Sequence, residues 1–410
     1  MMKSQALLAL LFAFAGSFGE TALANVITDW DEIAVKTVQP IGAPPAINPG
    51  LLFRAMAMTD IAMFNAVNAI DPHYQAYFVQ DPAPADASPE AAAAAAAAAV
   101  LTAIAPKADV GSTLDAYLAT LPEGDAKARG VKVGEDAGNR ILALRADDGC
   151  KVPNAYRPVT TPGVYVGTAP VVGWETIAMK PFAMTAPSQF RPGPPPDLKS
   201  DLWAKDYNEI KELGEKNSAK RTARQTEDAR FWLTTGPLAT HAFERQIVDA
   251  RKMSLLDSAR FMALMSIAEA DAIEAVYEAK FHYQFWRPVT AIRNGDIDDN
   301  PNTERQANWE PIDQTPSHPE YPCAHCIVSM AVATVIATEL GGNEIPEVSI
   351  SMPSAPGVIH RYTNLDAYTE EVANARIYAG FHYRNSTVIG QDMGRKIGAY
   401  VSKTVLQPLK

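Results

Sequence analysis

Residues 318–337 read HPEYPCAHCIVSMAVATVIA, a segment rich in proline, histidine and cysteine that runs into a long apolar stretch. Pro322 stands where a helix would begin, which places the amides of Cys323 and Ala324 in its first turn. First-turn amides have no intrahelical acceptor and lie at the positive end of the helix dipole, so they favour an anion. His325 lies on the same turn. Taken alone, it is as consistent with a buried core histidine as with a catalytic one.

Helical periodicity dominates the rest of the chain. Apolar spacing predicts helices at 51–70, 91–104, 110–119, 124–146, 198–213, 226–234, 238–251, 255–283, 329–339, 367–378 and 388–405. No alternation is long enough for a sheet core, so the predicted fold class is all-α, built from helical bundles. Residues 149–196 carry ten prolines and predict an irregular connection. This connection is the natural boundary between an N-terminal helical region, 25–196, and a C-terminal helical domain, 197–410.

The net charge of the chain and its apolar N-terminal segment limit the possible partners and the place of action. The 410 residues carry a formal net charge of −11, which argues against nucleic acid as a partner. Lys3, the apolar stretch 6–15 and the small-x-small pattern at 22–24 predict a signal peptide over residues 1–24. We therefore expect a mature chain from about Asn25, periplasmic or secreted, with no stable membrane anchor.

Three cysteines, Cys150, Cys323 and Cys326, are too few for a disulfide scaffold. The C-x-x-C pair at 323 and 326 has three interpretations. The two can form a disulfide at one helix turn, remain buried thiols that pack as small apolar groups, or belong to a redox or thiolate metal site. The residues alone leave these interpretations open.

Two further segments place cations in apolar surroundings. In KFHYQFWRP, Lys280 and Arg287 are seven residues apart, about two helical turns, so both can lie on one face. In RIYAGFH, an ideal helix would leave Arg376 and His382 roughly 120° apart, so a break at Gly380 is needed for them to converge. The alternatives are a solvated basic edge for the first segment and cations placed against a helix dipole for the second.

Together the three segments offer a lysine, two arginines, two histidines and a helix N-terminus. Such a set suits a tetrahedral oxyanion, because guanidinium groups pair with its oxygens and helix amides neutralise the remaining charge. An oxyanion site is therefore the predicted chemistry.

The order of these motifs resembles the signature shared by vanadium-dependent haloperoxidases and type 2 phosphatidic acid phosphatases, Lys-x6-Arg-Pro, Pro-Ser-Gly-His and Arg-x5-His. Lys280 with Arg287-Pro288, Pro322 with His325, and Arg376 with His382 match its three parts. Residues 54–72, 189–196, 225–232 and 285–293 are also similar to the bacterial haloperoxidase-related branch.

The resemblance implies a helical-bundle enzyme whose site holds vanadate, or phosphate in hydrolytic relatives. It makes His382 the apical histidine, which ligates vanadium in peroxidases or attacks phosphorus in phosphatases. It makes His325 the acid–base histidine. Lys280 would hold an equatorial oxygen and polarise a bound peroxide.

In the same resemblance Arg287 and Arg376 neutralise the remaining charge, and the Ala324 amide donates a hydrogen bond. His318 matches a histidine of bromoperoxidase-like members and favours a peroxidase, although a plain loop histidine is the alternative. Cys323 stands where the family has serine, and Ala324 where it has glycine, so one contact to the oxyanion is impaired.

This sequence also lacks an acidic residue that the family often has after the apical histidine. A carboxylate that often steadies this histidine from four residues further on is replaced by Ser386. The predicted function is a vanadium-dependent haloperoxidase acting on hydrogen peroxide and halide. The alternatives are an acid phosphatase with a phosphohistidine at His382 and a non-catalytic phosphate or oxyanion binder. The substrate, the halide and the formation of homo-oligomers stay open.

Overall fold

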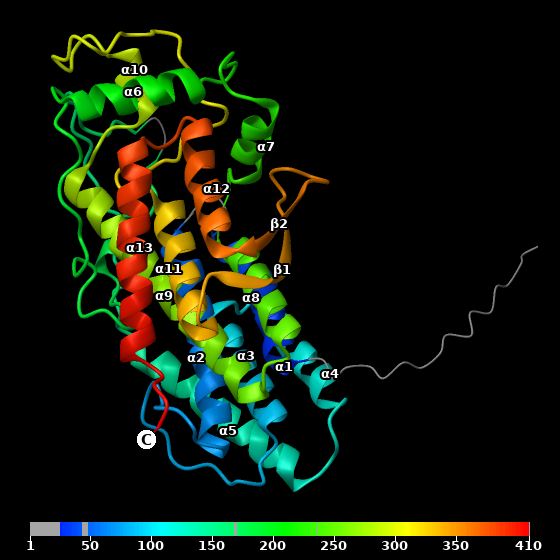
Figure 1. Cartoon of the computed structure of the whole chain (residues 1–410). Coiled ribbons are helices and arrows are strands. Elements are labelled where there is room, and N and C mark those ends of the chain that lie inside the picture. The colour runs from blue at the N-terminus through cyan, green and yellow to red at the C-terminus, as the bar shows by residue number, and fades with distance from the viewer. Residues whose placement is uncertain (1–24, 43–47, 168–169, 235, 410) are drawn as a thin grey trace, which may run out of the picture.

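The computed structural model describes residues 25–42, 48–167, 170–234 and 236–409. In this part of the chain helices dominate, and a single two-stranded sheet accompanies them (Figure 1). The predicted all-α fold class is confirmed. The predicted signal peptide, residues 1–24, lies outside the described residues.

The elements follow one another along the chain with their bounds as follows. They are α1 (Val26–Val38), the 3-10 helix η1 (Gln39–Gly42), α2 (Pro49–Ile70), α3 (Pro89–Ile104), α4 (Val110–Leu118), α5 (Asp125–Leu144), the 3-10 helix η2 (Trp174–Ala178), α6 (Asp201–Leu213), α7 (Ala223–Phe231), α8 (Pro237–Arg251), α9 (Leu255–Tyr283), α10 (Pro288–Arg293), α11 (Ala324–Leu340), β1 (Glu344–Ser351), β2 (Ile359–Asn364), α12 (Leu365–Tyr378) and α13 (Arg384–Thr404).

The first bundle consists of α1, α2, α3, α4, α5 and α8, packed against one side of α9. Small residues allow its helices α3 and α5 to pack closely. α3 begins at Ser88, whose side chain accepts from the Ala91 amide, and its alanine run is buried. Gly130 and Gly134 of α5 face α3 so closely that an added Cβ would lie 2.3 Å from the Ser88 carbonyl and 2.2 Å from the Ala92 carbonyl. The alanine stretch is therefore a closely packed helix, as predicted.

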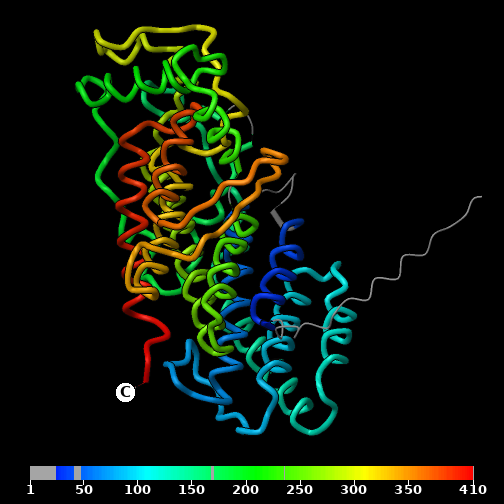
Figure 2. Tube along the Cα trace, turned by 45° about the vertical axis from the view of Figure 1, so that its right-hand side comes forward, coloured from blue at the N-terminus to red at the C-terminus, as the bar shows by residue number. Residues whose placement is uncertain are grey.

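The long helix α9 connects the two ends of the molecule. Its buried residues run from Ser258 to Phe281, and it packs against α2 on one side and against α11 and α13 on the other (Figures 1 and 2). Because α9 is buried almost all round, it places Lys280, near its C-terminal end, inside the protein rather than at its surface.

Besides the two 3-10 helices, four elements, α1, α10, β1 and β2, are not among those that the sequence periodicity predicts. α1 is capped by Asn25 and α10 is a single short helix after Pro288. β1 and β2 form an antiparallel hairpin in which Val348 lies opposite Tyr362, and β1 packs on α8. Six to eight residues of strand are too short to stand out from the helical pattern around them.

α2 is long and apolar enough to cross a membrane. However, 83% of its most apolar window is buried inside the protein. It packs against α3, α5 and α9, so it is a core helix of the first bundle.

Candidate active site

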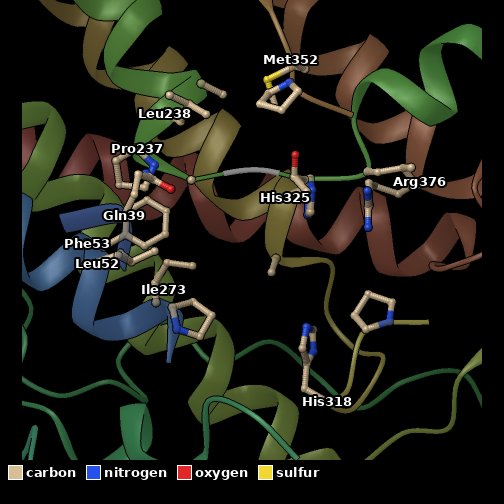
Figure 3. A pocket seen from close by; sticks show the side chains of 18 of the residues that line it. Gln39, Leu52, Phe53, Pro237, Leu238, Ile273, His318, His325, Met352 and Arg376 are labelled. Atoms are coloured by element: carbon tan, nitrogen blue, oxygen red, sulfur yellow. The ribbon is translucent and has the colours of Figure 1, made fainter. Parts of the chain in front are cut away.

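The second bundle consists of α9, α11, α12 and α13. The three predicted segments meet at one end of this bundle. Lys280 comes from the last turn of α9, Arg287 is the N-cap of α10, and His325 lies in the first turn of α11. Arg376 lies in the last turn of α12, and His382 lies in the connection to α13. A cavity of about 470 Å³ opens between them and the first bundle (Figure 3).

Lys280 is fully buried and its ammonium group is saturated. Its Nζ donates to the carbonyls of Pro319, at 3.0 Å, Glu320, at 2.7 Å, and Pro322, at 2.5 Å. An ammonium group has three donors, so none is left over in this structure. Lys280 therefore holds the 319–322 loop and contributes charge from behind the cavity wall. Its predicted contact with an oxyanion oxygen stays a prediction.

Arg287 also lies behind the wall and links two histidines. Its Nη2 donates to Nδ1 of His318 at 3.0 Å, and its Nη1 lies 3.3 Å from Nε2 of His382. Its remaining contacts are the backbone carbonyls of His318 and Phe381, both at 2.9 Å. Because a guanidinium only donates, both histidine nitrogens act as acceptors here.

Gly380 supplies the break that brings Arg376 and His382 together. α12 ends at Tyr378, and Gly380 adopts φ +78°, a conformation that favours glycine. The amides of Phe381 and His382 then turn back to the Arg376 carbonyl, at 3.1 and 3.3 Å. A Cβ on Gly380 would lie 2.5 Å from the Gly214 carbonyl, so this position also requires close backbone approach.

Arg376 is the donor that faces the cavity without partners. Its Nη1 donates to the Trp232 carbonyl, and its guanidinium lies over the ring of Phe381. Its Nε and Nη2 are buried and have no hydrogen-bond partner among the described residues. Burial lowers the pKa of Arg376 to about 9, with a further contribution from Arg287. A buried guanidinium with two free donors is costly unless an anion pairs with it.

The start of α11 provides the third side of the site. The helix begins at Ala324, one residue later than Pro322 alone suggested, and Cys323 is its N-cap. Cys323 and Cys326 form a disulfide, so the structure selects the first of the three interpretations of this pair. Their buried cluster with Ala373 lies apart from the cavity, whereas Ala324 and His325 line it. Nε2 of His325 is unpartnered among the described residues.

Glu320 is a site residue that the sequence analysis did not select. Its Oε1 lies 2.8 Å from Nδ1 of His382 and accepts from the Tyr383 amide at 3.2 Å. The carboxylate missing at Ser386 is thus supplied by the loop before α11. Glu320 stands in the opening motif, between His318 and Pro322, but only the fold shows that this loop reaches His382.

The buried charges of the site do not balance. Among the described residues, Glu320 is the one carboxyl group that opposes the cationic groups of Lys280, Arg287 and Arg376 at close range, and burial raises its pKa to about 7. Burial and the neighbouring Arg287 lower the pKa of Lys280 well below its usual value. Burial, followed by the neighbouring cations, lowers the pKa values of His318, His325 and His382 well below the usual 6.5. The histidines are therefore neutral near pH 7, and the excess positive charge calls for an anion.

The cavity has two chemically different sides. Ala324 and His382 line it, together with His318, His325 and Arg376, which Figure 3 shows on one side. The opposite side carries apolar groups from α2, α8 and α9, namely Leu52, Phe53, Pro237, Leu238 and Ile273 (Figure 3). An anion bound at the polar side would be screened from bulk water by this apolar wall.

Comparisons with known proteins agree with this architecture. Residues 260–410 match the family model of the VCPO second helical-bundle domain. The chain is similar in structure to a bacterial vanadium-dependent iodoperoxidase, with a TM-score of 0.76 and 22% identity over 93% of this chain and 98% of that one. The search of curated proteins gives no match.

Two further solved structures are similar. The apo-type bacterial vanadium-dependent chloroperoxidase has a TM-score of 0.70 and 16% identity, covering 88% of this chain and 95% of that one. The holo-type has 0.69 and 16%, covering 91% and 95%. These structures show that the chain has the fold of the vanadium haloperoxidases, which is the fold that the resemblance in its sequence implied.

Proposed function

We propose that this protein is a vanadium-dependent haloperoxidase-like enzyme that uses hydrogen peroxide to oxidise a halide. The observation that carries the proposal is the pair of buried, unpartnered donors of Arg376, Nε and Nη2, beside the free Nε2 of His325. The likeness to bacterial vanadium iodoperoxidase and chloroperoxidase structures supports it.

The residues fit a tetrahedral oxyanion such as vanadate. Vanadate would be held by the two donors of Arg376, by the amides of Ala324 and His325 in the first turn of α11, and by Nε2 of His382, which Arg287 contacts in this structure. Vanadate, when bound, supplies the Lewis-acid chemistry through which peroxide becomes able to oxidise halide.

The side chains around the bound oxyanion would then act in proton transfer, in orienting His382 and in supplying positive charge. Neutral His325 can take a proton at Nε2 from an incoming peroxide and return it later. Glu320 orients His382 by accepting from Nδ1–H, which leaves Nε2 as the nitrogen without a proton. Arg287 and Lys280 fix the 318–322 loop and add positive charge.

The test is peroxide-dependent halogenation. Purified protein loaded with vanadate is expected to iodinate or brominate a dye in the presence of hydrogen peroxide, and His382→Ala is expected to abolish this activity. Aryl phosphate hydrolysis measured on the same protein without vanadate, and again after vanadate is added, is the comparison. Hydrolysis that vanadate inhibits, without halogenation, would show that the site is a phosphatase instead.

The place of action is part of the proposal. We infer that the mature chain starts near Asn25 and works outside the cytoplasm, in the periplasm or medium. The signal-like sequence of residues 1–24 supports this, and so does the Cys323–Cys326 disulfide, since disulfides persist in oxidising compartments. Mass spectrometry of the N-terminus of secreted protein tests it, and an intact Met1 would contradict it.

A further inference from the structure

A second cluster of ionisable residues lies in the first bundle, away from the active site. Asp31 comes from α1, Asp60 from α2, His241 and Glu244 from α8, and Glu269 from α9. Every pair of these four helices is in contact (Figure 1). All five side chains are fully buried. Glu269 is eleven residues before Lys280, about 16 Å of helix rise from the active site.

Two of the cluster's four carboxylates, Asp60 and Glu269, have one oxygen in a hydrogen bond and the other without a partner among the described residues. Ser266 donates to Oδ2 of Asp60, while Oδ1 of Asp60 has no partner among the described residues. Nε2 of His241 lies 3.0 Å from Oε2 of Glu269, while Oε1 of Glu269 is unpartnered. A carboxylate that is oriented through one oxygen has its other oxygen available as a metal ligand.

Glu244 is the strongest sign of a missing ligand. Both of its oxygens are buried without a hydrogen-bond partner in the described chain, and Oε2 lies 3.8 Å from Nδ1 of His241. His241 and Glu244 are three residues apart on α8, so they share one face of the helix. A protonated carboxyl group would still leave its O–H and its carbonyl without hydrogen-bond partners there, which is unfavourable in a buried position.

The geometry suits one cation. Single ligand atoms of Asp31, Asp60 and His241 lie within 4.8 Å of one another. Arg245 pairs with Oδ2 of Asp31 at 2.5 Å, and Oδ1 of Asp31 lies 2.6 Å from Nδ1 of His241, so an ion bound between these two atoms would take the place of the proton that they share. Histidine and carboxylate ligands on facing helices are the arrangement by which helical bundles hold transition metals.

We propose that this cluster binds a divalent first-row transition metal ion, of the Mn²⁺, Fe²⁺ or Zn²⁺ class, through His241 and the carboxylates of Asp31, Asp60 and Glu244, while Glu269 orients His241 from its Nε2 side. One imidazole among carboxylates favours these ions over Ca²⁺ and Mg²⁺, which prefer oxygen ligands alone.

Metal analysis of the full-length protein tests the proposal. Protein is produced in media supplemented with Mn²⁺, Fe²⁺ or Zn²⁺, and its metal content is measured by mass spectrometry. We expect about one ion per chain for at least one metal, and for Mn²⁺ an electron paramagnetic resonance signal of a bound ion. Metal content near zero in all three media would overturn the proposal, and this result depends on no variant.

Glu244→Gln and a matched control locate the ion. Because Glu244 has no hydrogen bond to lose, Glu244→Gln keeps the shape of the core, and we expect metal content or affinity to fall about tenfold or more. Glu274→Gln changes another fully buried carboxylate without partners, beside Arg145, and is expected to leave the metal unchanged. Equal metal content in both variants and the wild type would place the ion elsewhere and refute the site.

Discussion

Glu320 reaches Nδ1 of His382 across 62 positions of sequence, with 2.8 Å between the two atoms. The contact replaces the carboxylate that Ser386 fails to provide, and it comes from the loop that Lys280 holds in place. A buried carboxylate at this point assigns the proton of His382 to Nδ1 and leaves Nε2 as an acceptor, which Arg287 contacts at 3.3 Å in this structure. The orientation of Nε2 thus depends on a residue of another segment.

Glu320→Gln is predicted to change the pH dependence of stability. Burial raises the pKa of Glu320 to about 7, so between pH 4.5 and 7 the folded protein binds more protons than the unfolded chain. The stability that protonated Glu320 contributes is therefore present below pH 4.5 and lost as pH rises through 7. The free energy of unfolding of Glu320→Gln relative to wild type should rise by about 3 kcal/mol over this range. Denaturant titrations at several pH values measure it, and a constant difference would contradict it.

The same substitution should weaken the proposed function. Glutamine cannot supply the negative charge that makes Nε2 of His382 a better ligand, so vanadate affinity should fall about 10–100-fold. Ser386→Ala, which alters the neighbouring hydroxyl, serves as the control and should change affinity little. Isothermal calorimetry with vanadate measures both variants. Unchanged affinity in Glu320→Gln would mean that the contact only packs the core.

Arg376→Lys tests whether the hydrogen bonds of Arg376 contribute to anion affinity beyond its positive charge. Lysine retains the positive charge but loses the two free guanidinium donors, Nε and Nη2. Hydrogen bonds to a charged group contribute about 1.5–3 kcal/mol, so phosphate or vanadate affinity should fall about 10–100-fold. Arg384→Lys, at a partly exposed arginine paired with Glu209, is the control. Thermal shift with added phosphate reports binding, and an equal shift in wild type and Arg376→Lys would exclude Arg376 as the main ligand.

The candidate site shows what spacing can and cannot predict. Lys280, Arg287 and Arg376 were found because buried cations in apolar helices are unusual, and Gly380 because the helical angle required a break. The spacing of residues in the sequence could not show which donors of these cations lack a partner, because the acceptors lie in loops whose paths the sequence pattern does not predict. The saturation of Lys280 by three carbonyls and the reach of Glu320 both arise in the 318–322 loop, whose path only the folded chain determines.

In the fold, too, the sequence predicts the long periodic helices but not the short elements. The helices expected at 51–70 and 255–283 are found at 49–70 and 255–283, because long apolar periodicity constrains them strongly. The hairpin of β1 and β2 and the short α10 carry too few residues for a periodic signal. The Asp31–His241 contact was equally hidden, because its two residues are 210 positions apart.

Lys280→Met is predicted to destabilise the protein even without a ligand. The substitution removes three hydrogen bonds and leaves the carbonyls of Pro319, Glu320 and Pro322 buried without their donor. With about 1–3 kcal/mol for an unsatisfied buried group, we expect the free energy of unfolding to fall by about 2–4 kcal/mol. Lys36→Met, at a surface lysine, should change it by less than about 0.5 kcal/mol. Chemical denaturation compares them, and a gain in stability would instead identify Lys280 as an anion ligand strained in the free protein.

Gly134→Ala is predicted to be far more damaging than the same change at Gly111. In a helix interior, glycine to alanine ordinarily stabilises by up to about 1 kcal/mol. At Gly134 the new Cβ would lie 2.2 Å from the Ala92 carbonyl and 2.8 Å from the Ala95 side chain, both on α3, so the two helices must separate. Overpacking of this kind costs about 3 kcal/mol, against a small gain at Gly111, where no atom lies within 4 Å. Thermal denaturation of the two variants measures the contrast, and similar melting temperatures would show that α3 and α5 do not pack this closely.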